Sequence, residues 1–305
     1  MQNYSSIIEL VQEKSRLLPE TRAYTFLAYN GEESQSLSYR EIENQACAIA
    51  SRIQQIYSES ESVEGEQLPR VLLVYPPGLD FITAFYACLF SGYIAVPVSP
   101  PDPLRLERTL PRFLSTIKDS GASMILTTTE KHADILHLLQ ADSQQSKPSA
   151  QQEQLNSLRE LIHNDNIYTL KTEAIELKYA ASWQAPTIKV DNIAFLQYTS
   201  GSTASPKGVM ISHANILHNL EIIHTVAMQD HHSCFVSWLP NYHDMGLIGS
   251  ILYPMYVGFH SVQMSSTSFL KRPISWLKAL TKYHGTITAA PNFAYELCVS
   301  RIPLA

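Results

Sequence analysis

Residues 198–213, YTSGSTASPKGVMISH, hold the densest group of side chains that could bind an anion. Five hydroxyl-bearing residues crowd around one glycine, and Pro206, Lys207 and Gly208 follow. Glycine lets a backbone come close to a ligand, while hydroxyls and exposed N–H groups donate to phosphate oxygens. The Lys207 ammonium adds a compact positive charge for the same oxygens. This succession of strand, loop, lysine and helix predicts a phosphate cradle, and an ordinary solvated Ser/Thr loop is the alternative.

The order of residues in this loop argues against a Walker kinase or GTPase. A Walker A loop reads GxxxxGK(S/T), whereas here Lys207 precedes Gly208 and Pro206 stands in front. A second candidate constellation is the adjacent pair His243–Asp244. A serine hydrolase triad is a poor interpretation of it, because adjacent residues rarely point at one another and no G-x-S-x-G elbow exists. A buried, helix-capping His–Asp pair is the alternative.

No metal site is predicted from the protein side chains. His231, His232 and Cys234 are close in sequence, but their spacing fits no zinc pattern well. The four cysteines are far apart and form no CxxC pair, which indicates reduced, mostly buried thiols of a cytoplasmic protein.

Composition sets the class of protein. With 305 residues, 45% of them hydrophobic and 16% charged, the chain can bury a large core in one domain or two smaller ones. A net charge of −6 with scattered Lys and Arg argues against nucleic-acid binding. The uncharged stretches 81–101 and 245–270 are interrupted by Gly or Pro and lack basic flanks, so no transmembrane segment is expected. No signal peptide is evident at the N-terminus.

The periodicity of apolar residues predicts an α/β fold with mostly parallel sheet layers covered by helices. A helix over 5–18, a hairpin turning at Asn30–Gly31 and an S-x-x-E capping box at Ser38 and Glu41 come first. Strands are expected at 71–75, 93–98, 123–128 and 193–199, and helices at 79–90 and 106–119. The polar stretch 140–157 predicts a surface insertion. Later elements are a helix after Ser212, the strands SCFVSWLP, GFHSVQM and GTITAAP, and helices near 244–256, near 269–283 and from Asn292.

The loop resembles a known signature. YTSGSTASPKG is similar to (S/T)-S-G-(S/T)-T-G-x-P-K-G of the adenylate-forming (AMP-binding) superfamily. Four further segments, in the expected order, resemble the fatty acyl-AMP ligases: YPPGLDFITAFYACLFSGYIAVPVSPP, SWLPNYHDMGLIGSIL, FLKRPISWLKAL and APNFAYELCVSRI. Ala204 departs from the signature, which has glycine there. If that position needs a positive φ, alanine costs about 1 kcal/mol or more.

The resemblance implies that residues 1–305 are part of the large N-terminal AMP-binding domain, with the small C-terminal lid domain beyond them. It implies ATP-dependent activation of a fatty acid to an acyl-adenylate with release of pyrophosphate, assisted by Mg²⁺. The product would pass to an acyl carrier protein in lipid or polyketide synthesis. A long-chain acyl-CoA synthetase of the same fold and a non-catalytic nucleotide- or lipid-binding fragment are the alternatives, and this chain alone is a candidate for an inactive piece.

The resemblance also implies site residues. The implied phosphate-binding residues are Thr199, Ser200, Gly201, Ser202, Thr203, Lys207 and Gly208. His243 and Lys207 are the implied catalytic residues, with His243 donating to an oxygen beside the acyl carboxylate and the α-phosphate. Contacts with the substrate fall to Asp244, Met245, Gly246, Asn292, Phe293 and Tyr295. Met245, Leu247 and Ile248 are candidates for the wall of an acyl tunnel and are equally well explained as core.

Overall fold

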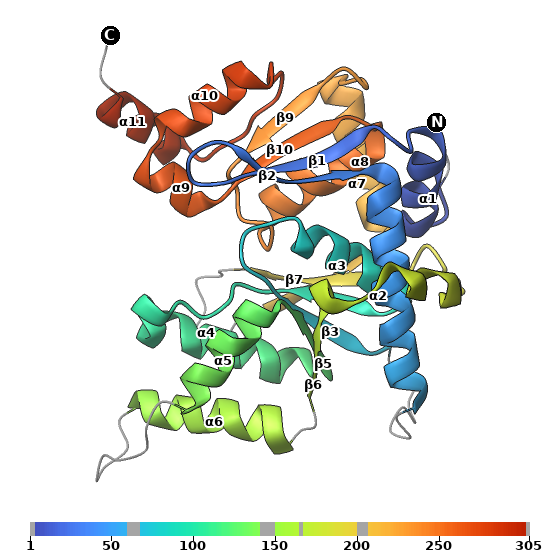
Figure 1. Cartoon of the computed structure of the whole chain (residues 1–305), viewed down its shortest axis with the longest axis vertical. Helices are drawn as coiled ribbons and strands as arrows, with labels where there is room; N and C mark the ends of the chain where they lie inside the picture. Colours follow the sequence, from blue (N-terminus) through green and yellow to red (C-terminus); the bar gives the residue numbers. More distant parts are fainter. Residues whose placement is uncertain (1–3, 60–67, 141–149, 165–166, 200–206, 303–305) are drawn as a thin grey trace. The chain divides into compact units, whose positions relative to one another are not determined.

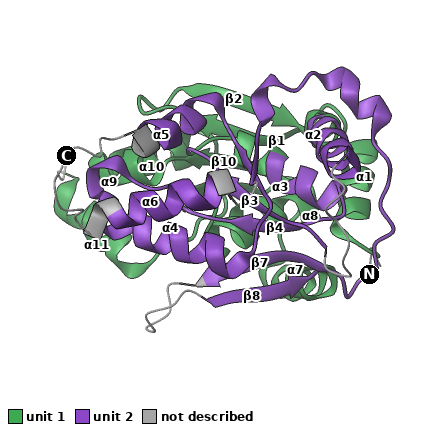
Figure 2. Ribbon diagram, turned by 90° about the horizontal axis from the view of Figure 1, so that it is seen from below, with its two compact units in different colours: residues 1–44, 77–83, 213–305 green, residues 45–76, 84–212 purple. Residues whose placement is uncertain are grey.

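The computed structural model describes residues 4–59, 68–140, 150–164, 167–199 and 207–302 (Figure 1). The chain divides into two compact units. Unit 1 contains residues 1–44, 77–83 and 213–305, and unit 2 contains residues 45–76 and 84–212 (Figure 2). Each unit is built around a sheet of its own, and each is described by itself.

Unit 2 contains a six-stranded sheet in the order β6–β5–β3–β4–β7–β8. Neighbouring strands are parallel except at one edge, where β8 runs antiparallel to β7. The strands are β3 (Arg70–Val74), β4 (Ile94–Pro97), β5 (Met124–Thr127), β6 (Tyr168–Lys171), β7 (Ile193–Thr199) and β8 (Lys207–Ser212). The predicted mainly parallel α/β sheet is therefore confirmed, and β6 is an additional strand.

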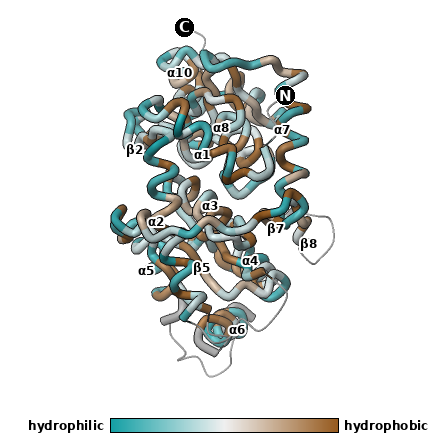
Figure 3. The backbone as a smooth tube through the Cα atoms, turned by 90° about the vertical axis from the view of Figure 1, so that its right-hand side faces the viewer, coloured by the Kyte–Doolittle hydropathy of each residue, from teal (hydrophilic) through white to brown (hydrophobic). Residues whose placement is uncertain are grey.

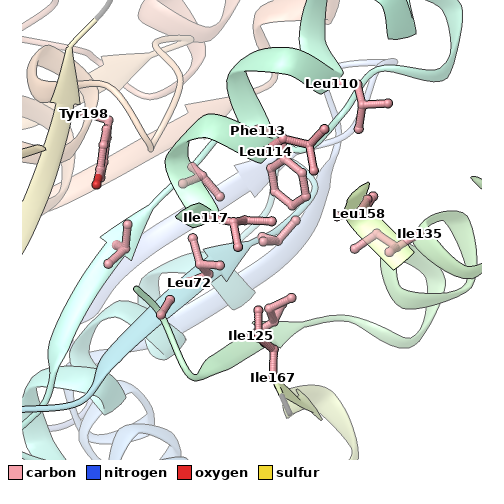
Figure 4. Close-up of a cluster of buried hydrophobic side chains, with 14 of the residues drawn as sticks. Leu72, Leu110, Phe113, Leu114, Ile117, Ile125, Ile135, Leu158, Ile167 and Tyr198 are labelled. Atoms are coloured by element: carbon pink, nitrogen blue, oxygen red, sulfur yellow. The ribbon is translucent and has the colours of Figure 1, made fainter. Parts of the chain in front are cut away.

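Apolar side chains cover both faces of this sheet, because successive residues of a strand point to opposite faces. The helices over one face are α4 (Leu106–Ser120), α5 (Thr129–Gln140) and α6 (Ala150–Asn164). Figure 4 shows Phe113 and Ile117 of α4 directed toward Leu72 of β3. On the other face Phe85 meets Phe195 of β7 edge to face, with ring centroids 5.7 Å apart. Phe85 belongs to α3 (Asp80–Phe90), which is hydrophobic along most of its length (Figure 3).

Helix α6 corrects part of the predicted polar insertion at 140–157. Residues 150–157 form the first half of this helix, and residues 141–149 lie outside the described part of the chain. Leu155 and Leu158 are buried in the same core cluster as Leu72, and Leu161 and Ile162 pack against it. Their spacing of three and four residues makes a narrow apolar stripe. The abundance of Gln and Ser around that stripe hid it from the sequence-based interpretation.

Unit 1 contains a four-stranded sheet in the order β2–β1–β10–β9. The strands are β1 (Arg22–Leu27), β2 (Glu33–Ser38), β9 (Cys234–Ser237) and β10 (His260–Met264), and only β1 and β2 are antiparallel. The predicted hairpin turn is confirmed. Gly31 has φ of +84°, a conformation open to glycine, and its N–H donates to the Ala28 carbonyl over 2.9 Å.

The helices of unit 1 are α1 (Ile7–Leu17), α7 (His213–Ala227), α8 (Tyr253–Val257), α9 (Ser266–Lys271), α10 (Ile274–Lys282) and α11 (Asn292–Arg301). Of these, α1, α7 and α11 begin near the residues where the sequence predicts a helix. The predicted capping box at the start of α2 (Tyr39–Glu59) is also confirmed. The Ser38 N–H donates to Glu41 Oε2 over 2.7 Å, and the Glu41 N–H donates to Ser38 Oγ over 3.3 Å.

Three predicted elements of unit 1 are wrong, and the one near 244–256 is part of the candidate site below. The single helix expected near 269–283 is two helices, α9 and α10, separated at Arg272–Pro273. Proline has no N–H to donate and disfavours the α conformation in the residue before it. Arg272 accordingly has φ of −144° and ψ of 78°.

The segment GTITAAP, residues 285–291, is not a strand either. Only Ile287 bridges to β9, opposite Phe235. Threonine hydroxyls make further contacts with the β9 backbone, because Thr286 Oγ1 accepts from the Cys234 N–H over 2.9 Å and Thr288 Oγ1 donates to the Val236 carbonyl over 2.7 Å. Backbone bonds to β9 are present as well, because the Thr286 and Ile287 N–H groups donate to the Cys234 carbonyl and the Ile287 carbonyl accepts from the Val236 N–H. The pairing is confined to one bridge, so no regular ladder forms.

Within the described ranges, no helix is long and apolar enough to cross a membrane. The cysteines at 47, 88 and 234 are buried and Cys298 is half-buried, and all four are free thiols, as expected.

Candidate active site

The hairpin of β7 and β8 carries the predicted phosphate-binding segment. Thr199 and Lys207 face each other in register at its open end, and Lys207 is exposed. Ser200, Gly201, Ser202, Thr203 and Ala204 lie outside the described residues, so the roles predicted for them stay predictions. The six residues of β8, which begin with Lys207, lie between the loop and α7, and α7 begins directly after Ser212, as predicted.

Tyr198 lies in β7, one residue before Thr199. Its hydroxyl donates to Asp119 Oδ2 over 2.6 Å, and its side chain is buried. Burial, reinforced by the bond to Asp119, raises the pKa of the Tyr198 phenol well above its usual range. The sequence analysis counts Tyr198 among the hydroxyl residues of the loop, but in the structure its hydroxyl bonds to Asp119 of α4.

Gly208 has a steric role that the motif did not reveal. It pairs directly with Tyr198 across the hairpin, and a Cβ at Gly208 would lie 2.9 Å from Tyr198 Cζ. Contacts that close are not tolerated, so a side chain at position 208 would displace the tyrosine ring. The glycine therefore lets Tyr198 lie flat across β8 while bonded to Asp119.

His243 and Asp244 lie between β9 and the following helical segment of unit 1. The His243 N–H donates to the Pro240 carbonyl over 3.1 Å, and the His243 carbonyl accepts from the Leu247 N–H over 2.7 Å. His243 Nδ1 lies 3.3 Å from Asp244 Oδ1, which also accepts from the Met245 N–H over 2.7 Å. The two adjacent side chains do interact, contrary to the expectation.

The exposure of His243 and Asp244 distinguishes a pair that can contact a ligand from a buried, helix-capping pair. The side chains of His243 and Asp244 are 51% and 66% exposed. Asp244 caps the next helical segment, as the alternative interpretation supposed, but neither side chain is buried. A neutral His243 that donates from Nδ1 to Asp244 presents Nε2 as an acceptor, whereas an imidazolium paired with Asp244 can also donate from Nε2. The pair can therefore offer a hydrogen bond of either sense to a ligand.

Residues Met245–Leu252 form a π-helical segment rather than the start of the single α-helix expected near 244–256. Such segments are rare and are frequent at functional sites. Gly246 is required here, because a Cβ at this position would lie 2.1 Å from the Pro240 carbonyl oxygen. Ser250 Oγ donates to the Gly246 carbonyl over 2.7 Å. Close backbone contact thus holds the turn that presents His243.

The apolar residues of the same segment divide between surface and core. Met245 is 47% exposed, Ile248 is half-buried and Leu247 is fully buried. Burial places Leu247 in the packed interior of unit 1. Met245 is accessible to a ligand.

Asn292, Phe293 and Tyr295 occupy the first turn of α11, and all three are exposed. Phe293 meets Trp238 edge to face with centroids 6.0 Å apart, and Tyr295 lies 5.7 Å from Trp276. Trp238 in turn stacks on Phe269 at 4.1 Å. We call these five aromatic residues (Trp238, Phe269, Trp276, Phe293 and Tyr295) the aromatic cluster. It joins the end of β9 to α9, α10 and α11.

Comparison of the sequence with protein families shows which family the chain belongs to. Residues 11–304 match the model of a family described as AMP-binding enzyme. The chain belongs to this family. Its AMP-binding fold also agrees with the mainly parallel, helix-covered sheets described above.

Relatives of this AMP-binding chain include fatty acid ligases. It is 38% identical over 98% of its length to a medium-chain fatty acid–acyl-carrier-protein ligase of Moorena producens, covering 46% of that protein. It is 31% identical over 97% of its length to a long-chain fatty acid–AMP ligase of Mycobacterium marinum, covering 47% of it. The chain spans about half the length of the curated relatives it matches.

A solved structure of the same kind is similar throughout. The fatty acyl-adenylate ligase of L. pneumophila, in complex with acyl adenylate and pyrophosphate, superposes with a TM-score of 0.82 at 37% identity. The match covers 99% of this chain and 47% of that one. The resemblance to fatty acyl-AMP ligases drawn from the motifs is confirmed.

Sequence reasoning missed two features of this AMP-binding chain's candidate site. Trp238, five residues before His243, and Trp276 form the buried support of Phe293 and Tyr295. The signal for Trp238 was its place in SWLPNYHDMG, directly after a strand. Trp276 lay in FLKRPISWLKAL, another of the segments that resemble the fatty acyl-AMP ligases. Among the residues that the structure describes, no three His, Cys, Asp or Glu side chains group as metal ligands.

Proposed function

We propose that this chain is the part of an AMP-forming ligase that binds ATP and a fatty acid and joins them as an acyl-adenylate. A carboxylate oxygen of the fatty acid attacks the α-phosphorus of ATP, the bond from that phosphorus to the bridging oxygen breaks, and pyrophosphate leaves. The observation that carries the proposal is the likeness, over 99% of this chain, to a ligase structure in complex with acyl adenylate and pyrophosphate.

The main difficulty of this reaction is charge, because an anion must approach a polyanion. We assign the β- and γ-phosphates to Lys207 and to the loop residues Thr199, Ser200, Gly201, Ser202, Thr203 and Gly208. The exposure of the Lys207 ammonium at the end of the hairpin supports this role. Mg²⁺, when bound, supplies further neutralisation of the phosphate oxygens, and it commonly binds through substrate phosphates with few protein ligands. We assign no protein ligand to it.

His243 is assigned as a hydrogen-bond donor to an oxygen of the reacting carboxylate or α-phosphate. Its pairing with Asp244 supports the role, because a carboxylate 3.3 Å from Nδ1 orients the ring. Asp244 is thus a positioning residue. Gly246 contributes through the backbone turn that its lack of a side chain permits.

The acyl part of the substrate is assigned to exposed apolar side chains of unit 1. Met245, Phe293 and Tyr295 are each about half exposed, with Asn292 beside the two aromatic residues. The acceptor of the activated acyl group is proposed to be an acyl carrier protein, because the relative from Moorena producens is named for that acceptor. The reaction would take place in the cytoplasm, on the argument from the cysteines.

The test is fatty-acid-dependent ATP–pyrophosphate exchange with Mg²⁺, run on this chain beside the Moorena producens ligase as a positive control. Lys207→Met should lower exchange about 100-fold and weaken ATP binding more than fatty-acid binding, as expected for loss of a phosphate contact. Lys189→Met removes another exposed lysine of unit 2 and should leave exchange unchanged.

The outcomes separate this proposal from its alternatives. Exchange supports the ligase, and transfer of the acyl group to coenzyme A in preference to a carrier protein would favour an acyl-CoA synthetase. Binding of ATP and fatty acid without exchange would favour a non-catalytic binding fragment, an alternative supported by the half-length match to the relatives. Equal losses of ATP and fatty-acid binding in Lys207→Met would contradict the phosphate role.

A further inference from the structure

Unit 1 contains a pocket of about 760 Å³ that includes none of the residues predicted for the ligase site. Its walls come from α1, from the last turns of α7 with the chain that follows them, and from α8. Its lining includes Lys14, Glu221, His224, Gln229, Asp230 and Tyr256. All of them belong to the same compact unit.

Lys14 places a buried positive charge in this pocket. The residue is 7% exposed, and its Nζ donates to the Val257 carbonyl over 3.3 Å. None of the ion pairs of the described residues includes Lys14, and among these residues its Nζ has no hydrogen-bond partner besides the Val257 carbonyl. Burying an ammonium without a counter-ion is costly, and burial lowers the pKa of Lys14 although Glu13 opposes that effect. A bound anion would remove this cost.

Two further polar side chains of the pocket have hydrogen-bonding capacity to spare. The Nδ1 atom of His224 is buried and has no hydrogen-bond partner among the described residues. Gln229 Oε1 accepts from the Tyr253 hydroxyl over 2.6 Å, which leaves the two N–H donors of its amide for another group. A buried polar atom without a partner is destabilising, so a ligand that bonds to His224 also stabilises the fold.

Neither carboxylate of the lining, Asp230 or Glu221, is a counter-ion of Lys14 among the described ion pairs. Asp230 Oδ1 accepts from the His232 N–H over 3.0 Å and from Ser233 Oγ over 3.3 Å, so this carboxylate serves its own turn. Glu221 makes no ion pair with Lys14. The ammonium of Lys14 therefore defines the part of the pocket that suits negative charge.

We propose that this pocket binds a small anionic group, a carboxylate or a phosphate, with Lys14 as its counter-ion and His224 and Gln229 as hydrogen-bond partners. Met228, which is 81% exposed, lines the pocket, and Val226, which is 77% exposed, lies two residues before it, so both offer apolar surface at the pocket. The anionic group can thus come from a free inorganic or short organic anion, or from the head of an amphiphile whose tail covers these two side chains.

The experiment measures binding of inorganic phosphate, acetate and octanoate by calorimetry. It is done in a Lys207→Met background, so that the proposed phosphate loop does not contribute. Lys14→Met keeps the aliphatic stem and removes the charge, and it should weaken phosphate binding at least about tenfold. Arg16→Met removes an exposed cation of the same helix and should change nothing. NMR of the lysine side chains should show the Lys14 pKa rising when phosphate is added.

A second variant protects the test against a folding defect. His224→Phe keeps a ring against Tyr256, whose centroid lies 6.0 Å from that of His224, and loses only the nitrogen atoms. It should weaken anion binding while the chain stays folded. Octanoate binding tighter than acetate would identify an amphiphile, and equal binding would identify a free anion. Absence of binding, or equal affinity in Lys14→Met and Arg16→Met, would overturn the proposal without bearing on the ligase activity.

Discussion

The two regions that carry predicted site residues are held in different ways. In unit 1, the turn that presents His243 is packed backbone against backbone, with Gly246 against the Pro240 carbonyl. In unit 2, the β7–β8 hairpin is held at its base by Tyr198 and Asp119, while Lys207 at its end is exposed. The first region therefore tolerates little change in shape. In the second region, the Tyr198–Asp119 bond holds the base of the hairpin and Lys207 lies at its end, so Lys207 can be substituted without unfolding the chain.

The largest expected effect tests the rigidity of the His243 turn. Gly246→Ala places a methyl group 2.1 Å from the Pro240 oxygen and should lower the free energy of unfolding by about 3 kcal/mol or more. Gly249→Ala is the matched control in the same segment, because its Cβ would meet only Phe235 Cζ at 4.0 Å. Its effect should stay within about 1 kcal/mol. Urea unfolding measures both, and equal effects would show that the turn is not held by this contact.

The second prediction concerns the start of α7, directly after β8. His213 Nδ1 accepts from the Ile7 N–H over 3.2 Å, and burial lowers the pKa of His213 to about 4 from 6.5. Below pH 6.5 the unfolded chain takes up a proton that the folded chain refuses, so stability falls with pH down to about 4. The loss should be on the order of 3 kcal/mol.

Unfolding measured across this pH range tests that prediction. His213→Gln cannot titrate, so its stability should vary less between pH 6.5 and 4. His218→Gln alters an exposed histidine of the same helix and should keep the dependence of the native protein. A His213→Gln variant with an undiminished slope would show that other groups cause the acid sensitivity.

A smaller effect is expected at the base of the hairpin. Gly208→Ala should cost about 1–2 kcal/mol of unfolding free energy, because the Tyr198 ring must move away from its position over Gly208. In a Tyr198→Leu background the same change should cost less, since the ring is absent. A double-mutant cycle measures this coupling. Additive effects would contradict the steric role of Gly208.

The smallest effect on stability is expected at the tip. Lys207→Met should change the unfolding free energy by less than about 0.5 kcal/mol, because the side chain is exposed. Calorimetric unfolding of this variant, compared with Gly246→Ala, gives the sharpest contrast between the regions. A large loss at Lys207 would mean that the tip and the base of the hairpin are not separable.

Local signals in the sequence were sufficient for many of the elements and for the family. The capping box at Ser38, the turn at Gly31 and the alternating strands of unit 2 each depend on neighbouring residues, and all are confirmed. The predictions failed where a proline interrupted a helix and where a segment paired with β9 through a single bridge. Pro273 divided one helix into two, and the hydroxyls of Thr286 and Thr288 bonded to β9 where a strand was expected.

The sequence by itself determined which residues have the right chemistry: a lysine beside hydroxyls and glycine, and a His–Asp pair before a helical segment. The tertiary structure decided what holds them. Tyr198 and Asp119 are 79 residues apart, and the steric demand on Gly208 exists only because that tyrosine lies across it. Likewise, the burial of Lys14 without an ion-pair partner among the described residues depends on packing between α1, α7 and α8. Contacts between distant segments form only on folding, and no local pattern encodes them.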